Sequence, residues 1–319
     1  MPLPADEKVL ALSQNILGRF DAIFGLHAGF RPAHAKGTLL TGTFTPSPQA
    51  PSLTTAPHVQ RPSTPVTVRF SNSTGVPEIP DNDPHAGPHG MAIRFHLAEH
   101  SHTDIVSHST DGFPVHRGEE FLELLTALSS SDLSKPSDPK NPKPIETFLG
   151  THPTALAFEQ APKPPPSSFA RQTYFAVTAY KFTSADGTTR FGKYRIIPAA
   201  GNDFLDASAA KAKGANYLFD ELKERLARGP IKFTVMVQLA NDGDITDDAT
   251  VHWPEDRQLM PLGTLVLDKP APNDAAEQRR IIFDPIPRVE GIEPSADPLL
   301  ELRAAIYLMS GRRRRPPRN

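Results

Sequence analysis

Apolar residues in the first 25 positions recur at intervals of three and four residues. This period is typical of an α-helix with one apolar face. The run stops at Gly25, and glycine commonly follows the last turn of a helix. The pattern therefore predicts an N-terminal helix within residues 1–25, covering roughly residues 5–24. The apolar positions are Val9, Leu12, Ile16, Phe20 and Ile23.

Strand patterns dominate much of the remaining chain. In residues 66–70 and 91–97 apolar side chains alternate with polar ones, as in half-buried strands. About eight such runs are present, the number at which a closed barrel is filled by its own side chains. We therefore expect an α+β fold, in which helices surround an antiparallel eight-stranded β-barrel. Other strand-like runs lie near 37–46, 103–107, 173–182, 189–198, 231–239 and 262–269, and helical patterns near 117–129, 143–158, 214–228 and 296–310.

Long proline-rich loops separate these elements. The chain has 35 prolines, which concentrate at 45–65, 136–144 and 162–166. Loops of this length more often wrap around one body than connect independent domains. We predict a single domain over residues 1–319 that ends in a basic tail at 311–319.

The composition excludes several kinds of function. The net charge is −2, so no overall positive field attracts nucleic acid, and we expect no nucleic-acid partner. The absence of cysteine excludes thiol catalysis and zinc sites built on cysteine. No apolar run approaches the length of a membrane span, and residues 1–8 do not resemble the start of a secretory signal. We therefore expect no membrane partner and a cytoplasmic location.

Arg303 and Tyr307 lie four residues apart in a segment with a helical pattern, which places guanidinium and phenol on one face. A free phenol has a pKa of about 10. To keep it ionised at neutral pH, its surroundings must lower this pKa by roughly 3, which corresponds to about 4 kcal/mol. Bound Fe(III) together with a nearby arginine can supply this, as for a tyrosinate ligand of haem iron. By itself the pair does not decide the matter, because a helical tyrosine is more often a core residue.

Two earlier segments carry residues suited to the opposite side of a haem. His34 follows Arg31 by three positions, and Ser71 follows Arg69 by two. Cleavage of an O–O bond needs a group that removes a proton from one oxygen and returns it to the other, which imidazole can do near neutral pH. Arginine provides forked donors for carboxylates such as the haem propionates. Each residue alone has an ordinary alternative, a loop histidine or a surface ion pair.

Taken together, the motifs resemble the haem catalase family, and more closely the short catalase-related peroxidases that keep only the haem-binding barrel. His34-Ala-Lys-Gly, Val-Arg69-Phe-Ser and Arg303-x-x-x-Tyr307 occur in this order at fitting separations. The resemblance covers nearly all of residues 20–315. It implies a catalase-like barrel with haem b as the cofactor.

The resemblance also implies a role for individual residues. On the distal side of the haem, the resemblance implies His34 as acid and base and Ser71 as its orienting partner. We expect His108 to be a third catalytic residue there, in place of a residue that differs in full catalases. The residues implied to contact the cofactor are Tyr307 as the axial ligand of the haem iron, Arg303 beside it, Asp297 near that arginine, Arg31, Arg69 and Arg314 for the propionates, and Phe113 and Phe121 against the porphyrin. Asp297 also precedes Pro298, as the cap of a helix commonly does.

Two positions depart from the pattern of full catalases. Four residues after Asp104 those enzymes have an asparagine that helps to orient peroxide, whereas this chain has His108. Tyr180 stands where a histidine serves the proximal network of the large enzymes. Loss of the carboxamide should impair dismutation of two peroxides more than cleavage of one. We therefore expect weak catalase activity at most.

The expected activity is the reduction of organic hydroperoxides and hydrogen peroxide by small electron donors, through a ferryl intermediate. Isomerisation of a lipid hydroperoxide, as in allene oxide synthases, is an alternative because related haem barrels catalyse it. Haem binding or sensing without catalysis is a second alternative. The resemblance is also compatible with a homodimer.

A cluster of histidines offers a competing hypothesis, because imidazoles bind zinc, copper and nickel. The predicted turns and strands distribute these histidines over both faces of a strand and over two turns. This distribution favours the haem interpretation over a separate metal site. The residues are His85, His89, His96, His100, His102 and His108.

Overall fold

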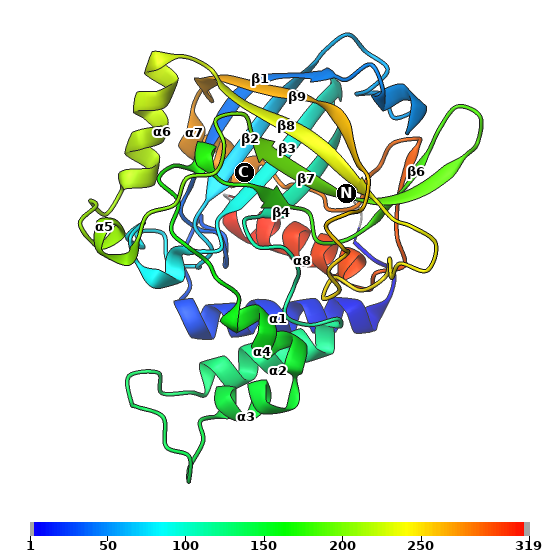
Figure 1. Cartoon of the computed structure of the whole chain (residues 1–319). Helices are drawn as coiled ribbons and strands as arrows, with labels where there is room; N and C mark the ends of the chain where they lie inside the picture. The colour runs from blue at the N-terminus through cyan, green and yellow to red at the C-terminus, as the bar shows by residue number, and fades with distance from the viewer. Residues whose placement is uncertain (1–2, 316–319) are drawn as a thin grey trace.

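The computed structural model describes residues 3–315 and contains a closed antiparallel β-barrel (Figure 1). Each barrel strand pairs with two neighbours, and pairing of β1 with β9 and of β7 with β8 completes the closure. The fold class expected from the sequence is therefore confirmed. The eight barrel strands are β1 (Gly37–Pro46), β2 (Thr64–Ser71), β3 (Gly90–Ala98), β4 (Ser101–His108), β5 (Tyr174–Phe175), β7 (Thr189–Pro198), β8 (Ile231–Leu239) and β9 (Leu259–Pro270).

Aromatic and branched side chains fill the barrel. Alternate residues of β2 and β3 are fully buried, as the two-residue period of a strand requires when one face points inward. Phe44 of β1 meets Phe95 of β3 edge to face at 5.1 Å, and Phe70 of β2 lies 6.1 Å from Phe233 of β8. Burying such a side chain contributes about 1.5–3 kcal/mol, so the barrel is a packed core and not a channel.

Two short strands extend the sheet beyond the barrel. β6 (Tyr180–Thr183) pairs with β7, and β10 (Ile292–Pro294) pairs with β6. Six helical segments connect strands along the described part of the chain. They are the short helices η1 (Ala50–Ser52), η2 (Pro84–Ala86), η3 (Phe169–Arg171) and α5 (Ala207–Lys211), and the helices α6 (Tyr217–Arg228) and α7 (Asp274–Arg280).

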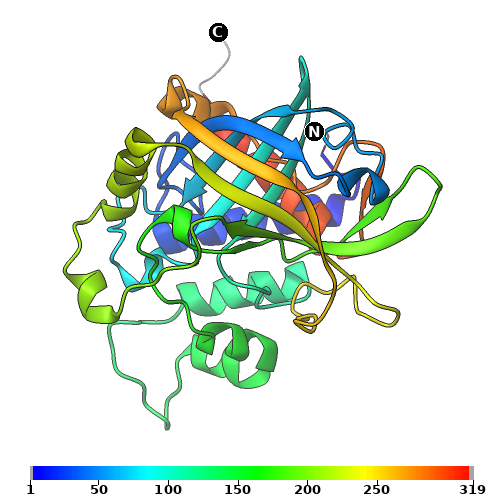
Figure 2. The ribbon, with the colours of Figure 1, turned by 45° about the horizontal axis from the view of Figure 1, so that its top comes forward.

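Helices cover one side of the barrel in successive layers. α8 (Leu299–Arg314) lies next to the barrel and α1 (Glu7–Phe24) lies outside it (Figure 1). Beyond α1 come α2 (Gly118–Ser129), α3 (Pro144–Thr151) and α4 (Pro153–Gln160), as the second view also shows (Figure 2). A Cβ at Gly118 would lie 2.3 Å from a Leu302 methyl group of α8, so glycine permits the close approach of α2.

Most predicted elements are confirmed, with three differences in extent. The helix predicted at 143–158 is two helices, because Pro153 cannot continue the helix that ends at Thr151. The strand predicted at 173–182 is divided into β5 and β6. The final helix continues past residue 310 to Arg314, which is buried, so residues 311–314 of the predicted basic tail are helical. Residues 316–319 of that tail lie outside the described residues.

Within residues 3–315, none of the helices combines the length and the apolar character that crossing a membrane requires.

Candidate active site

A cavity of about 250 Å³ lies between the ends of the barrel strands and α8. Its walls come from segments far apart in the chain: the loop before β1, the strands β2 to β4, and the helices α1, α2 and α8. Ten of the eleven residues predicted for the site line this cavity, and Asp297 does not. The ten are Arg31, His34, Arg69, Ser71, His108, Phe113, Phe121, Arg303, Tyr307 and Arg314.

The backbone at His34 is held in an unusual conformation. Its φ angle is 56°, in the left-handed region that residues other than glycine rarely adopt. The N–H of His34 donates to the carbonyl oxygen of Ser73 at 2.9 Å, and that of Ala35 to Thr74 at 2.9 Å. The carbonyl oxygen of His34 accepts from Nη2 of Arg69 at 2.8 Å. These contacts fix the direction of the imidazole, and such strain is characteristic of functional positions.

Ser71 orients the His34 ring. Nδ1 of His34 lies 3.1 Å from Oγ of Ser71, a hydrogen-bond distance. Both side chains lie against Gly90, where a Cβ would come within 2.6 Å of the Ser71 hydroxyl and 2.9 Å of the imidazole. Burial, followed by the charge of Arg69, lowers the pKa of His34 from 6.5 to about 3. The ring is therefore neutral at physiological pH and able to accept a proton.

A second imidazole, that of His108 at the end of β4, also lines the cavity. The N–H of Thr110 donates to Nδ1 of His108 at 3.3 Å, so this nitrogen is an acceptor and carries no proton. Burial, followed by the charge of Arg303, lowers the pKa of His108 to about 4. In the neutral ring the single proton must then lie on Nε2. His108 is thus an N–H donor on the cavity wall.

Arg303 and Tyr307 face the cavity from α8. Nε of Arg303 donates to the Tyr307 hydroxyl at 3.3 Å, and the guanidinium carbon lies 5.7 Å from the ring centre. Although burial opposes it, the charge of Tyr307 and then of Tyr180 raises the pKa of Arg303, which therefore stays cationic. The predicted four-residue spacing places a permanent cation beside the phenol oxygen.

Three arginines form a cationic edge of the cavity. Arg31 and Arg314 donate mainly to backbone carbonyl oxygens, and Arg69 to backbone carbonyl oxygens and one amide. Within residues 3–315 none of them pairs with a carboxylate. The carboxylate of Asp274 affects the arginines only through its charge at a distance, because its oxygens accept hydrogen bonds from Thr38 and Leu39. Burial, followed by the charge of Arg314, lowers the pKa of Arg69 to about 9. Burial, followed by the charge of Arg315, lowers the pKa of Arg314 to about 10.

Aromatic rings close the side of the cavity towards α1 and α2. Phe113 and Phe121 lie 5.3 Å apart, and Phe20 of α1 meets Phe121 edge to face at 6.0 Å. All three line the cavity. Flat apolar walls of this kind are suited to a flat apolar ligand.

The residues present fit a haem. The apolar walls suit a porphyrin, the unpaired arginines suit its two carboxylates, and a phenol beside a cation suits its iron. The unpaired arginines are the strongest indication, since buried cations without a carboxylate partner are costly unless an anion is bound. Tyr307 would hold the iron, and Arg31, Arg69 and Arg314 would hold the propionates.

Asp297 lies outside the cavity wall, at the start of α8. Its Oδ1 accepts a hydrogen bond from the N–H of Leu299 at 2.9 Å. Asp297 thus binds a free N–H group in the first turn of α8, as expected of a helix cap. Its other carboxylate oxygen is buried without a hydrogen-bond partner. Burial raises its pKa to about 6, and Arg303 acts in the opposite direction. The link between Asp297 and the site is therefore electrostatic, through Arg303.

The histidine cluster does not form a metal site among the described residues, where no three potential ligands converge. His85 pairs with Asp83 at the surface, and His96 hydrogen-bonds Thr67 at 2.9 Å. His89 is buried, and only His108 of the six lines the main cavity. The competing hypothesis therefore receives no support from the geometry.

Several residues that line the cavity carry no recognisable signal in the sequence. Phe20 belongs to the predicted helical face, where it could not be told from a core residue. Ile282 and Phe283 lie in a loop without periodic pattern that the barrel brings alongside α8. Gly90 carries no chemical group, and only its contact with His34 reveals its importance.

Comparison with known proteins agrees with the geometry. The family model described as Catalase matches residues 29–318. A catalase-related peroxidase of Mycolicibacterium paratuberculosis (strain ATCC BAA-968 / K-10) is 35% identical over 289 residues, which cover 90% of this chain and 89% of that protein. A catalase-related peroxidase of Synechococcus elongatus is 31% identical, with 92% and 86% covered. A catalase of Triticum aestivum is 29% identical, and the match spans 60% of its length.

Solved catalases share the fold. A fungal catalase superposes with a TM-score of 0.78 at 22% identity, covering 99% of this chain and 64% of that one. A bacterial catalase gives 0.76 at 23% identity, with 98% and 62% covered. At such low identity these structures support the architecture alone.

The chain belongs to the catalase family. This confirms the resemblance to catalase-related peroxidases, and with it the expected enzyme class of oxidoreductases that act on peroxide. Membership also implies a haem cofactor. The roles of the individual site residues and the single-domain boundaries remain predictions.

Proposed function

We propose that this protein is a haem b peroxidase that reduces organic hydroperoxides and hydrogen peroxide with small electron donors. One observation carries the proposal: a single cavity brings together two neutral imidazoles from the barrel side, a phenol–guanidinium pair from α8, and three unpaired arginines. Bound haem iron would supply the centre at which the O–O bond breaks and two oxidising equivalents are held.

His34 is the proposed acid and base. Its neutral ring would accept a proton from one peroxide oxygen and return it to the other as the O–O bond breaks. Ser71, at 3.1 Å from Nδ1, holds the ring so that its other nitrogen faces the cavity. Because burial keeps the pKa near 3, His34 is available as a base throughout the physiological range.

His108 is the proposed second donor of the distal pocket. Its Nε2–H can hydrogen-bond a peroxide oxygen, as an amide N–H would, but a neutral ring with Nδ1 already occupied offers no further acceptor. A carboxamide offers both a donor and an acceptor on one small group. We therefore propose efficient cleavage of one peroxide and weak catalase activity.

The proximal side rests on Tyr307 and Arg303. The phenol oxygen is the proposed ligand of the haem iron, and the Arg303 cation at 3.3 Å favours its anionic form. Asp297 is proposed to act on this pair only through its charge. A cytoplasmic location and a homodimer remain predictions.

Donor consumption tests the proposal. Haem-loaded protein is mixed with an unsaturated lipid hydroperoxide and a one-electron donor, and both are quantified. A peroxidase consumes two donor molecules per hydroperoxide. Loss of hydroperoxide without donor oxidation would identify an isomerase instead, and a haem-loaded protein that consumes neither would support binding or sensing. His34→Ala should retain haem and lose most of the turnover, with Ser71→Ala as a milder companion variant.

A further inference from the structure

Gln278, near the end of α7, contacts all three arginines of the cationic edge. Its backbone carbonyl oxygen accepts from Nη1 of Arg31 at 3.0 Å and from Nε of Arg314 at 3.3 Å. Its side-chain oxygen accepts from Nε of Arg69 at 3.1 Å, and its amide nitrogen donates to the carbonyl oxygen of Gly37 at 3.0 Å. Both hydrogen-bonding ends of the amide are therefore used, which fixes its orientation.

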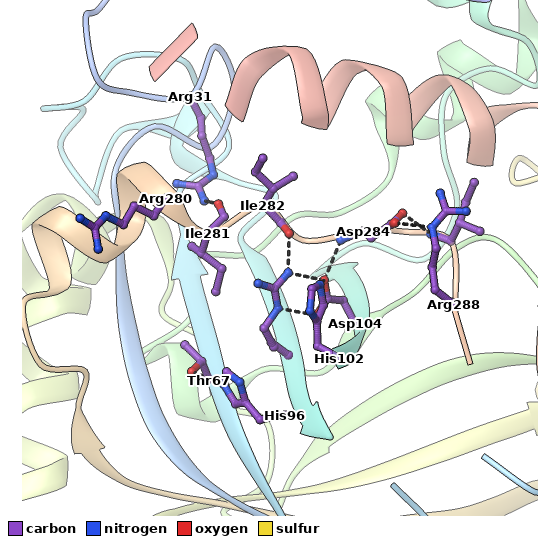
Figure 3. Close-up of polar contacts among 12 residues, drawn as sticks. Arg31, Thr67, His96, His102, Asp104, Arg280, Ile281, Ile282, Asp284 and Arg288 are labelled. Atoms are coloured by element: carbon purple, nitrogen blue, oxygen red, sulfur yellow. Dashed lines mark hydrogen bonds and ion pairs between the residues drawn. The ribbon is translucent and has the colours of Figure 1, made fainter. Parts of the chain in front are cut away.

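The backbone that follows Gln278 completes this arrangement. The carbonyl oxygen of Ile281 accepts from Nη2 of Arg31 at 3.0 Å, and also from Arg314. Figure 3 shows Arg31 reaching Ile281 on this segment, with Ile282 and Asp284 next along the chain. Arg31 and Arg314 thus each bridge the same two carbonyl groups.

An ion pair fastens the same segment to the barrel. Arg94 of β3 donates to both oxygens of Asp104 of β4, at 2.9 and 2.7 Å, and also to the carbonyl oxygen of Ile282. Asp104 accepts the N–H of Asp284 at 2.7 Å (Figure 3). Because Asp104 is fully buried, this contact holds the segment firmly against β3 and β4.

An amide at position 278 satisfies the arginines without neutralising them. A carboxylate in the same place would form an ion pair with Arg69 and cancel part of the charge. Burial and the neighbouring guanidinium groups already lower the pKa of Arg31 well below its usual value, so the cluster carries uncompensated charge. This arrangement costs stability in the empty protein and provides attraction for an anionic ligand.

We propose that Gln278 is a positioning residue that keeps Arg31, Arg69 and Arg314 charged, unpaired and aimed at the carboxylates of the haem. The inference rests on the proposed haem site and adds a residue that the resemblance did not mark.

Gln278→Glu tests this directly, with Ala276→Glu as the matched control. Both variants add one negative charge to α7, but Ala276 is exposed and makes none of these contacts. Iron-free protoporphyrin IX is the first probe, since it has the carboxylates and lacks the metal that Tyr307 would hold. Its affinity is measured by fluorescence quenching, that of haem by absorption titration, and the thermal midpoint of the empty protein by circular dichroism.

We expect Gln278→Glu to leave the thermal midpoint of the empty protein nearly unchanged, because the new ion pair with Arg69 offsets the lost hydrogen bond to Gly37. Porphyrin and haem binding should weaken roughly ten- to hundredfold, the usual effect of losing one charge-assisted hydrogen bond. Ala276→Glu should change neither. If Gln278→Glu binds protoporphyrin as tightly as the unaltered protein, or lowers the midpoint and the affinity together, Gln278 is merely a structural residue. If the unaltered protein binds neither porphyrin nor haem, the proposed function itself fails, and the positioning role fails with it.

Discussion

The low pKa of His34 predicts an unusual pH dependence for peroxide cleavage. A histidine with the ordinary pKa of 6.5 would be only about 3% neutral at pH 5, and a base of that kind would lose roughly thirtyfold in rate between pH 8 and pH 5. With a pKa of about 3, His34 stays about 99% neutral at pH 5. We expect the rate constant for the first reaction with peroxide to be nearly constant over this range.

Burial of the His34 ring and the charges around it lower its pKa, and the charges offer a way to change that pKa. Burial is the largest cause, followed by Arg69, His108, His89 and Arg31. Removing the nearest of these cations, in Arg69→Gln, should raise the pKa of His34 and move the fall in rate to a higher pH. Stopped-flow measurement on haem-loaded protein between pH 4.5 and 8 checks both expectations. A tenfold fall per pH unit beginning near 6.5 in the unaltered protein would refute the reasoning.

Stability must be followed in the same experiment. Four histidines in desolvated surroundings have folded pKa values between about 3 and 4, below the unfolded value near 6.5. The unfolded chain therefore binds more protons at these positions below about pH 6.5. Their contribution to stability is constant above that pH and falls as pH decreases towards the folded pKa values, by about 1.4 kcal/mol per pH unit for each histidine. Circular dichroism at each pH separates this loss from a change in catalysis. The four are His34, His58, His89 and His108.

Three substitutions test other parts of the account. His108→Asn should increase oxygen release from hydrogen peroxide, because it restores a carboxamide; an oxygen electrode measures this, and no increase would remove His108 from the explanation of weak catalase activity. Asp104→Asn leaves Arg94 without its buried partner and should cost about 3–5 kcal/mol in urea unfolding; a loss below about 1 kcal/mol would show that the pair does not fasten the 281–284 segment. His58→Leu removes two buried ring nitrogens that have no hydrogen-bond partners. This substitution should raise the free energy of unfolding by about 1–3 kcal/mol. A lower unfolding midpoint would show that these nitrogens do not destabilise the fold.

Regular elements could be predicted because their cause lies in local periodicity. β1, β7 and β8 begin and end where the alternation of side chains predicts. The short α7 could not be predicted, since it has no buried residue and therefore no apolar period. Its presence depends on contacts with distant parts of the chain, such as the Thr38 hydroxyl that donates to Asp274. Local pattern contains no information about such contacts.

The site was predictable where a motif carries its own chemistry. His34, Ser71, Arg303 and Tyr307 were predicted because they stand in motifs that, in this order and at these separations, resemble those of the catalase family. Gln278 was not, because glutamine is common and its importance comes only from a position shared by three arginines. The tautomer of His108 could not be predicted from the sequence either, because it depends on the direction of one backbone N–H group.

The central claim is that the phenol oxygen of Tyr307 binds haem iron, and the absorption spectrum of Tyr307→Phe tests it most directly. The unaltered protein is loaded with haem and its spectrum is recorded beside that of the variant, with circular dichroism to show that both are folded. We predict that the variant either fails to retain haem or shows a clearly different iron spectrum. Full haem retention with an unchanged spectrum would contradict the claim.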